Sequence, residues 1–170
     1  MLGILLYIQI GERMRKETID KFLEKETKLA LEVASKLIEK PKVSIMVVVF
    51  PFLLINFIQE LRIYRYKREF FLKEYLFLKR LVCDFLNADD LLDDELEKRL
   101  ENVLVKDEKY KELYCCQIRE GIAIKRYLSG ESEEVSIRFK EIETLKKTIE
   151  VLDLKGDALE TSQRLLNILV

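Results

Sequence analysis

The segment from Val43 to Ile58 restricts the fold of this chain more than any other feature. Its sixteen residues contain no charged side chain, and only Ser44 and Asn56 are polar. As a helix, the segment would be apolar on every side, so it has to be buried in lipid or in protein. Pro51 lies near its middle, where it removes a backbone hydrogen bond and is expected to kink the helix.

Helices are expected on both sides of this segment. The 170 residues include only 5 Gly and 2 Pro, too few for the turns of a many-stranded sheet. Apolar residues recur at steps of three, four and seven from Met14 to Ile38, which predicts an amphipathic helix that ends at Lys40, before Pro41. Gly130 is expected to end a later helix.

The predicted fold is therefore all-α, with about five to six helices. One long kinked helix is expected over about residues 43–86, and the helices after it form a C-terminal bundle. We divide the chain into an N-terminal amphipathic helix (1–40), the apolar segment with a basic amphipathic helix (43–86), and a helical bundle (89–170). These three parts could also form one domain.

Two of the expected bundle helices carry an apolar stripe that is predicted to face inward. For the helix over about 91–105 the stripe is Leu92, Leu96, Leu100, Val103 and Leu104. For the helix over about 132–154 it is Val135, Phe139, Ile142, Leu145, Ile149 and Leu152. Asp89 or Asp90 is expected to cap the first of these helices, because carboxylates stabilise a helix N-terminus.

A membrane is the first environment that would bury the apolar segment. Sixteen residues reach about 24 Å as a helix, short of the roughly 30 Å of a hydrocarbon core, so a simple span is marginal. Basic residues on both sides favour a bent wedge that enters and leaves the same face of the bilayer. The residues predicted to insert are Val47, Val48, Phe50, Pro51, Phe52, Leu54 and Phe57. Those predicted to contact headgroups or a partner are Arg62, Arg65, Lys67 and Arg68.

A protein interior is the second environment. The overall hydropathy is close to neutral, which is ordinary for a soluble chain. In this alternative the protein is a soluble helical interaction module that buries residues 43–58 in its core or in a homodimer interface. The predicted function is accordingly a non-enzymatic, membrane-associated helical scaffold, with the soluble module as the alternative. The expected partners are a membrane surface or another protein, and a homo-oligomer is expected.

Charge is distributed unevenly along the chain. From Arg62 to Arg80 seven basic residues face two acidic ones, a net of +5, and from Asp84 to Glu101 eight acidic residues face two basic ones, a net of −6. The basic stretch fits a place beside an anionic membrane surface. Nucleic acid is not expected as a partner, because the whole chain has a net charge of −1.

Sequence motifs for catalysis are missing. The chain has no histidine, its five glycines are far apart, and its three cysteines do not have zinc-ligand spacing. We therefore predict no enzymatic activity, no cofactor and no metal. Cys115 and Cys116 are adjacent and point about 100° apart on a helix, so at most one of them should face a core. Reduced thiols fit a cytoplasmic location, including the cytoplasmic face of a membrane.

Overall fold

The computed structural model of this chain describes residues 2–42, 53–88, 91–105, 107–151 and 157–169. Within these ranges every regular element is a helix, which confirms the all-α prediction. Residues 43–52, and with them the predicted kink at Pro51, lie outside the described residues.

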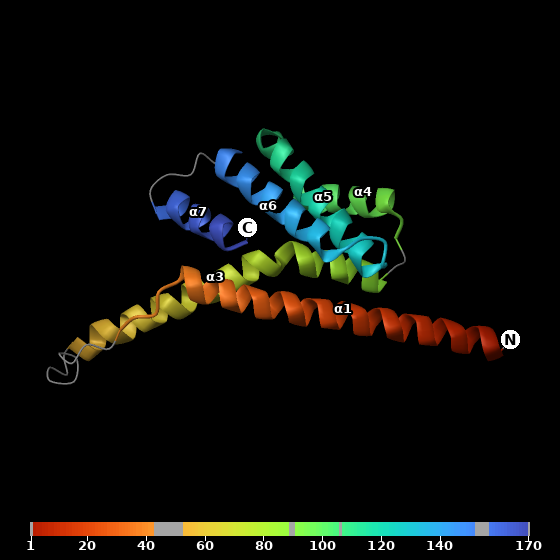
Figure 1. Cartoon of the computed structure of the whole chain (residues 1–170), viewed down its shortest axis with the longest axis horizontal. Helices are drawn as coiled ribbons and strands as arrows, with labels where there is room; N and C mark the ends of the chain where they lie inside the picture. Colours follow the sequence, from red (N-terminus) through yellow and green to blue (C-terminus); the bar gives the residue numbers. More distant parts are fainter. Residues whose placement is uncertain (1, 43–52, 89–90, 106, 152–156, 170) are drawn as a thin grey trace.

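The elements of the described part of the chain follow in this order: α1 (Leu2–Leu37), α3 (Leu53–Ala88), α4 (Asp93–Leu104), the short 3-10 helix η1 (Glu108–Tyr110), α5 (Lys111–Leu128), α6 (Glu134–Val151) and α7 (Asp157–Leu169). They form two layers (Figure 1). In the first layer α1 packs along α3, and in the second α5 packs between α4 and α6. Contacts of α5 with α3, and of α7 with α1, join the two layers.

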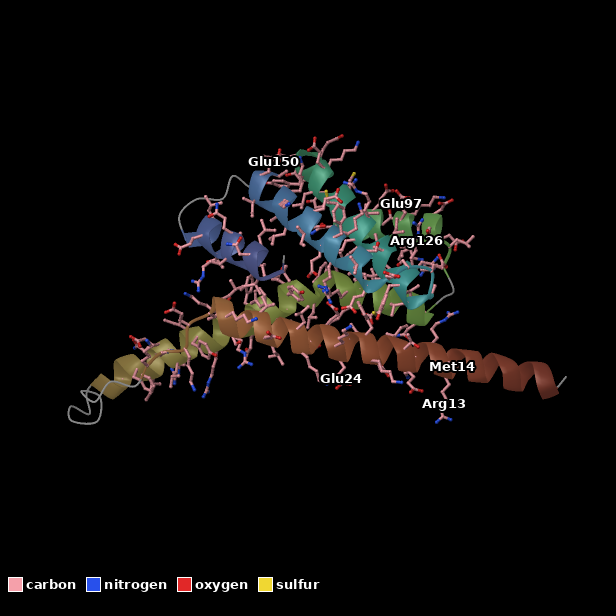
Figure 2. All side chains as sticks on the ribbon, in the orientation of Figure 1. Arg13, Met14, Glu24, Glu97, Arg126 and Glu150 are labelled. Atoms are coloured by element: carbon pink, nitrogen blue, oxygen red, sulfur yellow. The ribbon has the colours of Figure 1, made fainter. Side chains whose placement is uncertain are left out.

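The first layer extends beyond the second at both ends (Figure 1). At one end, the extending part is the N-terminal part of α1, where the 65% exposed side chain of Met14 points away from the second layer (Figure 2). At the other end it is the first half of α3. The first half of α3 is therefore one of the two parts of the described chain that the second layer leaves accessible to a large partner.

One hydrophobic core lies between the two layers. Its fully buried side chains come from five helices: Ile19 of α1, Val82 and Cys83 of α3, Leu96 and Leu100 of α4, Ile124 of α5 and Ile137 of α6. Gly121 allows α5 to approach its neighbours closely, because a Cβ atom there would lie 2.6 Å from Leu100 Cδ1 and 3.3 Å from Val82 Cγ2.

The end of α5 confirms the predicted stop at Gly130. This glycine has φ 75°, a left-handed conformation that other residues rarely adopt. Its N–H donates to the Tyr127 carbonyl at 3.0 Å, and the Glu131 N–H donates to the Arg126 carbonyl at 2.8 Å. These bonds satisfy carbonyls of the last helical turn, as in a Schellman motif.

Two predicted helix ends differ from the structure. The first helix ends at Leu37 and not at Lys40. The residues that follow, 38–42, are not helical and pass along α3. The helix predicted from about Leu91 begins at Asp93. Asp89 and Asp90, the predicted caps, lie outside the described residues. The Leu92 N–H instead donates to the Glu95 carboxylate at 3.3 Å.

Two predicted inward stripes are partly wrong. On α4, Leu96, Leu100 and Leu104 are buried as predicted, but Leu92 is 71% exposed and Val103 is 37% exposed. On α6, Val135 and Phe139 are 72% and 66% exposed. The side chains that α6 does bury are Ile137, Glu141 and Thr144. This helix turns a partly polar face inward because Glu141 meets charged partners there.

Candidate functional site

One face of α3 carries a row of large apolar side chains that are open to solvent. Ile63, Tyr66, Phe70 and Phe77 follow at steps of three, four and seven, and Ile55 lies eleven residues before Tyr66, so all five share one helix face. Their exposed fractions run from 48% for Phe77 to 69% for Tyr66. The row is about 33 Å long at the rise of an α-helix. We call these five residues the apolar stripe.

Basic side chains accompany the apolar stripe along one flank. Arg62 and Lys73 lie four residues before and seven residues after Tyr66, and both are exposed. Arg65 and Arg80 are exposed beside them, and Glu69 lies among them. An exposed apolar row with basic side chains beside it is a feature of surfaces that bind a partner or a membrane.

Most of the predicted insertion residues cannot be placed on this surface. Val47, Val48, Phe50, Pro51 and Phe52 lie outside the described residues. Leu54 belongs to α3, but its side chain is outside the described part. Phe57 is half-buried, whereas its neighbours Ile55 and Ile58 are 62% and 41% exposed.

The four predicted headgroup contacts do not share one face. Arg62 and Arg65 are exposed on the basic flank of the apolar stripe. Lys67 is exposed on the opposite flank, where it lines a groove. Arg68 is half-buried, and its Nε is enclosed without a hydrogen-bond partner among the described residues. The basic flank therefore contains two of the four predicted residues, together with Lys73 and Arg80.

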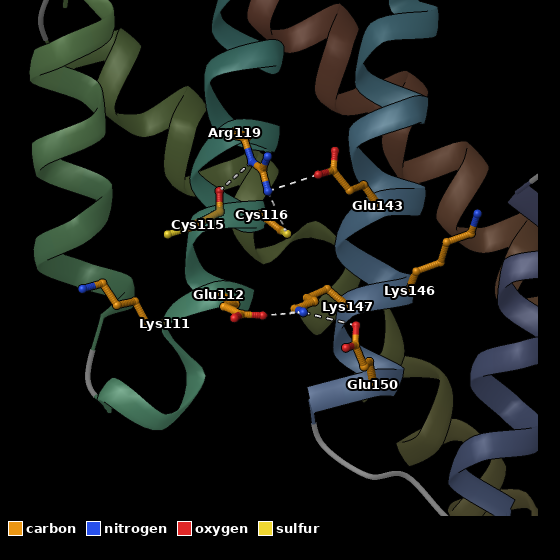
Figure 3. A pocket seen from close by; sticks show the side chains of 9 residues that line it. All are labelled: Lys111, Glu112, Cys115, Cys116, Arg119, Glu143, Lys146, Lys147 and Glu150. Atoms are coloured by element: carbon orange, nitrogen blue, oxygen red, sulfur yellow. Dashed lines mark hydrogen bonds and ion pairs between the residues drawn. The ribbon is translucent and has the colours of Figure 1, made fainter.

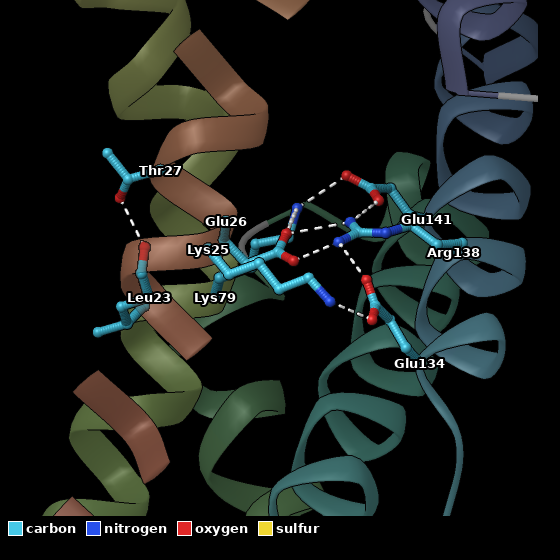
Figure 4. Close-up of polar contacts among 8 residues, drawn as sticks. All are labelled: Leu23, Lys25, Glu26, Thr27, Lys79, Glu134, Arg138 and Glu141. Atoms are coloured by element: carbon cyan, nitrogen blue, oxygen red, sulfur yellow. Dashed lines mark hydrogen bonds and ion pairs between the residues drawn. The ribbon is translucent and has the colours of Figure 1, made fainter. Parts of the chain in front are cut away.

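A cluster of buried charges lies between the two layers, and the sequence analysis missed it. The Lys79 Nζ of α3 lies 2.7 Å from a Glu141 oxygen of α6 and 3.4 Å from a Glu26 oxygen of α1 (Figure 4). Lys79 and Glu26 are each only 1% exposed. Arg138 of α6 donates to Glu141 at 2.8 Å and to Glu26 at 3.0 Å. The Tyr75 ring lies 3.7 Å from the Lys79 ammonium.

The charges of this cluster perturb its carboxyl groups. Burial pushes the pKa of Glu141 upward, but the charge and hydrogen bond of Lys79, together with Tyr75 and the charge of Arg138, outweigh it, so this pKa lies below its ordinary value. Glu120 of α5 is 6% exposed and has no ion pair among the described residues. Burial raises the pKa of Glu120 to about 7, against the opposing charge of Lys79. With Glu120 protonated, two cations balance two carboxylates.

The burial of this cluster decides how we interpret it. Lys79 and Glu26 are too enclosed for a dissolved substrate to contact them. An ion pair removed from water to this extent needs the full set of its partners, and these partners come from three different helices. We interpret the cluster as a structural connection between α1, α3 and α6.

A second groove, of about 580 Å³, runs between α5 and α6 on the outside of the second layer (Figure 3). Five of its charged side chains pair with one another: Arg119 lies 3.1 Å from Glu143, and Lys147 lies between Glu112 and Glu150. Arg119 also donates to the Cys116 sulfur at 3.2 Å. With Lys111 and Lys146, the lining has four basic and three acidic side chains, a net charge of +1, and we assign no ligand to this groove.

The three cysteines are free thiols. Cys115 is exposed and its neighbour Cys116 is buried, which confirms that at most one of the pair faces the core. Cys83 is buried in the core between the two layers.

Metal binding and membrane crossing find no support in the described ranges. No group of three or more cysteine, aspartate or glutamate side chains there is arranged to hold a metal ion. Over the same residues, no helix combines the length and hydropathy that crossing a bilayer requires. No known protein family matches the chain, and no curated protein and no solved structure is similar to it.

Proposed function

We propose that this protein is a non-enzymatic helical scaffold that binds an anionic membrane surface through the apolar stripe of α3. The exposure of that stripe beside a basic flank carries the proposal. Removing apolar surface from water is favourable by a free energy of about 25 cal/mol per Å². Basic side chains near an anionic bilayer add about 1 kcal/mol each. A helix with both properties lies in the plane of the headgroups.

The end of the apolar segment supports a membrane over a core of the protein's own. Ile55 and Ile58 are the last described apolar residues of Val43–Ile58, apart from the half-buried Phe57, and both are open to solvent. If the segment were the centre of a compact bundle, these side chains would be buried. The first half of α3 also extends beyond the second layer, where a flat surface has access to it (Figure 1).

In this proposal the second layer remains outside the bilayer and is available to protein partners. The cytoplasmic face of a membrane is the location that we propose, since the exposed thiol of Cys115 suits a reducing compartment.

Vesicle flotation tests the proposal. We expect the full chain to float with phosphatidylcholine vesicles that contain phosphatidylserine, and much less with phosphatidylcholine alone. The double variant Tyr66→Ser, Phe70→Ser should lose binding, because it removes two exposed rings of the stripe. The matched control is Val135→Ser, Phe139→Ser, which removes equally exposed apolar groups from α6 and should bind as the wild type does. No flotation with either vesicle would overturn the proposal.

The basic flank has its own test. Arg62→Glu, Arg65→Glu should abolish the preference for phosphatidylserine, because it reverses two exposed charges beside the stripe. Lys98→Glu, Lys109→Glu makes the same change of charge on exposed residues elsewhere and should retain the preference. A dimer without vesicles, dissociated by the Tyr66→Ser, Phe70→Ser change in light scattering, would instead identify the stripe as a homodimer interface.

A further inference from the structure

A groove of about 570 Å³ runs along the flank of α3 opposite to the basic one. One wall is α3, the other is formed by Leu37, Ile38 and Pro41, and Thr161 of α7 also contributes. The half-buried rings of Tyr64 and Phe71 line its interior. We call it the aromatic groove. Its size is that of a ligand site, and its lining is mostly apolar.

The rim of the aromatic groove is acidic. Glu39, Glu60 and Glu74 are exposed on it, against the single ammonium of Lys67. Within the described part of the chain, none of these three carboxylates forms an ion pair or a side-chain hydrogen bond. The groove therefore has three negative charges and one positive, a net of −2. The opposite flank of the same helix, with Arg62 and Arg65, is positively charged.

The length of the groove indicates the form of its ligand. Glu60 and Glu74 are fourteen residues apart on α3, which is about 21 Å along a helix axis. Aromatic side chains continue between them, at Tyr64, Phe70 and Phe71. A long apolar channel with carboxylates at both ends matches a helix of about fourteen residues.

We propose that the aromatic groove binds a basic amphipathic helix of a partner protein. The apolar side chains of that helix, at positions i, i+3 or i+4, and i+7, enter between Tyr64 and Phe71. Its lysines and arginines pair with Glu39, Glu60 and Glu74, and they also interact favourably with the faces of nearby aromatic rings. The proposal does not rest on membrane binding, although Ile63, Tyr66 and Phe70 belong to the apolar stripe and also line the groove.

A synthetic peptide tests the groove in the absence of vesicles. The probe is a fluorescently labelled helical peptide of leucine and lysine, with leucine at the spacing given above, and the readout is fluorescence anisotropy with the full chain. We expect binding that weakens with added salt. The same peptide with glutamate in place of lysine should bind at least about tenfold more weakly, because its negative charges are repelled by the carboxylates of the rim.

Matched charge variants locate the binding. Glu60→Gln, Glu74→Gln should weaken binding of the lysine peptide about five- to tenfold, by the loss of two ion pairs. Glu97→Gln, Glu101→Gln removes the same charge from exposed positions on α4 and should leave the affinity unchanged. Equal weakening in both variants, no binding of the lysine peptide, or equal binding of the two peptides would each overturn the proposal. None of these results depends on whether the protein binds vesicles.

Discussion

Lys79 and Glu141 are 62 residues apart in the sequence, yet the Lys79 ammonium donates to the Glu141 carboxylate at 2.7 Å in the interior of the protein. This bond joins the first layer of helices to the second. Glu26 of α1 approaches the same ammonium at 3.4 Å, so a single lysine connects three helices. Because the three side chains are almost fully enclosed, removing one partner leaves the buried charges of the others with too few opposite charges around them.

Replacement of Lys79 by methionine is therefore expected to lower the stability of the fold severely. Lys79→Met retains most of the side-chain volume but leaves Glu26 and Glu141 with Arg138 as their nearest remaining cation. Breaking a buried ion pair in this way costs about 3–5 kcal/mol of the free energy of unfolding. Urea denaturation followed by circular dichroism measures it.

The control for this change is Lys28→Met, since Lys28 pairs with Glu24 on the exposed face of α1. We expect Lys28→Met to leave the free energy of unfolding unchanged within measurement, because both side chains are hydrated. If the two variants were equally stable, the buried cluster would not be paired as described.

Glu120 gives the protein a specific dependence on pH. Burial raises its pKa to about 7, with Glu141 adding to the shift and Lys79, Thr144 and Arg138 opposing it. The ordinary value is 4.5, so the folded state binds this proton more tightly than the unfolded state does. The stabilisation is complete below pH 4.5 and is lost as the pH rises through about 7.

The variant Glu120→Gln removes this ionisation. We expect it to be more stable than the wild type at about pH 8, where the wild type has to bury a charge, and similar at about pH 5. Thermal denaturation at the two pH values measures the difference. Glu97→Gln, an exposed carboxylate on α4, is the control and should show the same difference from the wild type at both. An equal effect of Glu120→Gln at both pH values would mean that Glu120 ionises normally.

Periodicity in the sequence was enough to predict the helices, because it reflects burial directly. Leu96, Leu100 and Leu104 repeat every four residues and are buried as predicted. The same rule failed for Val135 and Phe139, which are exposed. Periodicity identifies a face, but it cannot say which of two faces a helix buries when charged residues are also drawn inward.

The sequence contains a sign of the buried cluster that a count of charges does not detect, namely charged residues at core positions of the helical repeat. Glu26 lies four residues after Phe22 and four before Ala30, on the stripe that α1 buries. Lys79 precedes the buried Val82 by three residues in the same way. A charged residue in register with a core stripe predicts burial, but its partners on other helices follow only from the tertiary structure. The surface of α3 was no easier to predict: only Arg62 and Arg65 of the four predicted contact residues lie on the basic flank, because the packing of other helices decides which face of α3 remains exposed.

The thiols should differ sharply in reactivity. Cys115 is exposed, Cys116 is 5% exposed, and Cys83 is fully buried. Burial raises the pKa of Cys83 to about 12, so its thiolate is scarce at neutral pH. We expect Ellman's reagent to modify one thiol rapidly in the folded protein and all three in denaturant. Cys115→Ser should leave no rapid phase, and a rapid phase in that variant would contradict the burial of the other two.

Gly121 should tolerate alanine poorly, although alanine favours helices. The new Cβ atom would lie 2.6 Å from Leu100 Cδ1, and Leu100 is itself fully buried, so it has little room to move. Overpacking costs about 1–3 kcal/mol and outweighs the gain of about 1 kcal/mol in helix propensity. We therefore expect Gly121→Ala to lower the free energy of unfolding in urea by about 1 kcal/mol. Leu100→Val removes the atom in conflict, so Gly121→Ala should cost less in that background than in the wild type. A stabilising Gly121→Ala would mean that Leu100 moves aside freely.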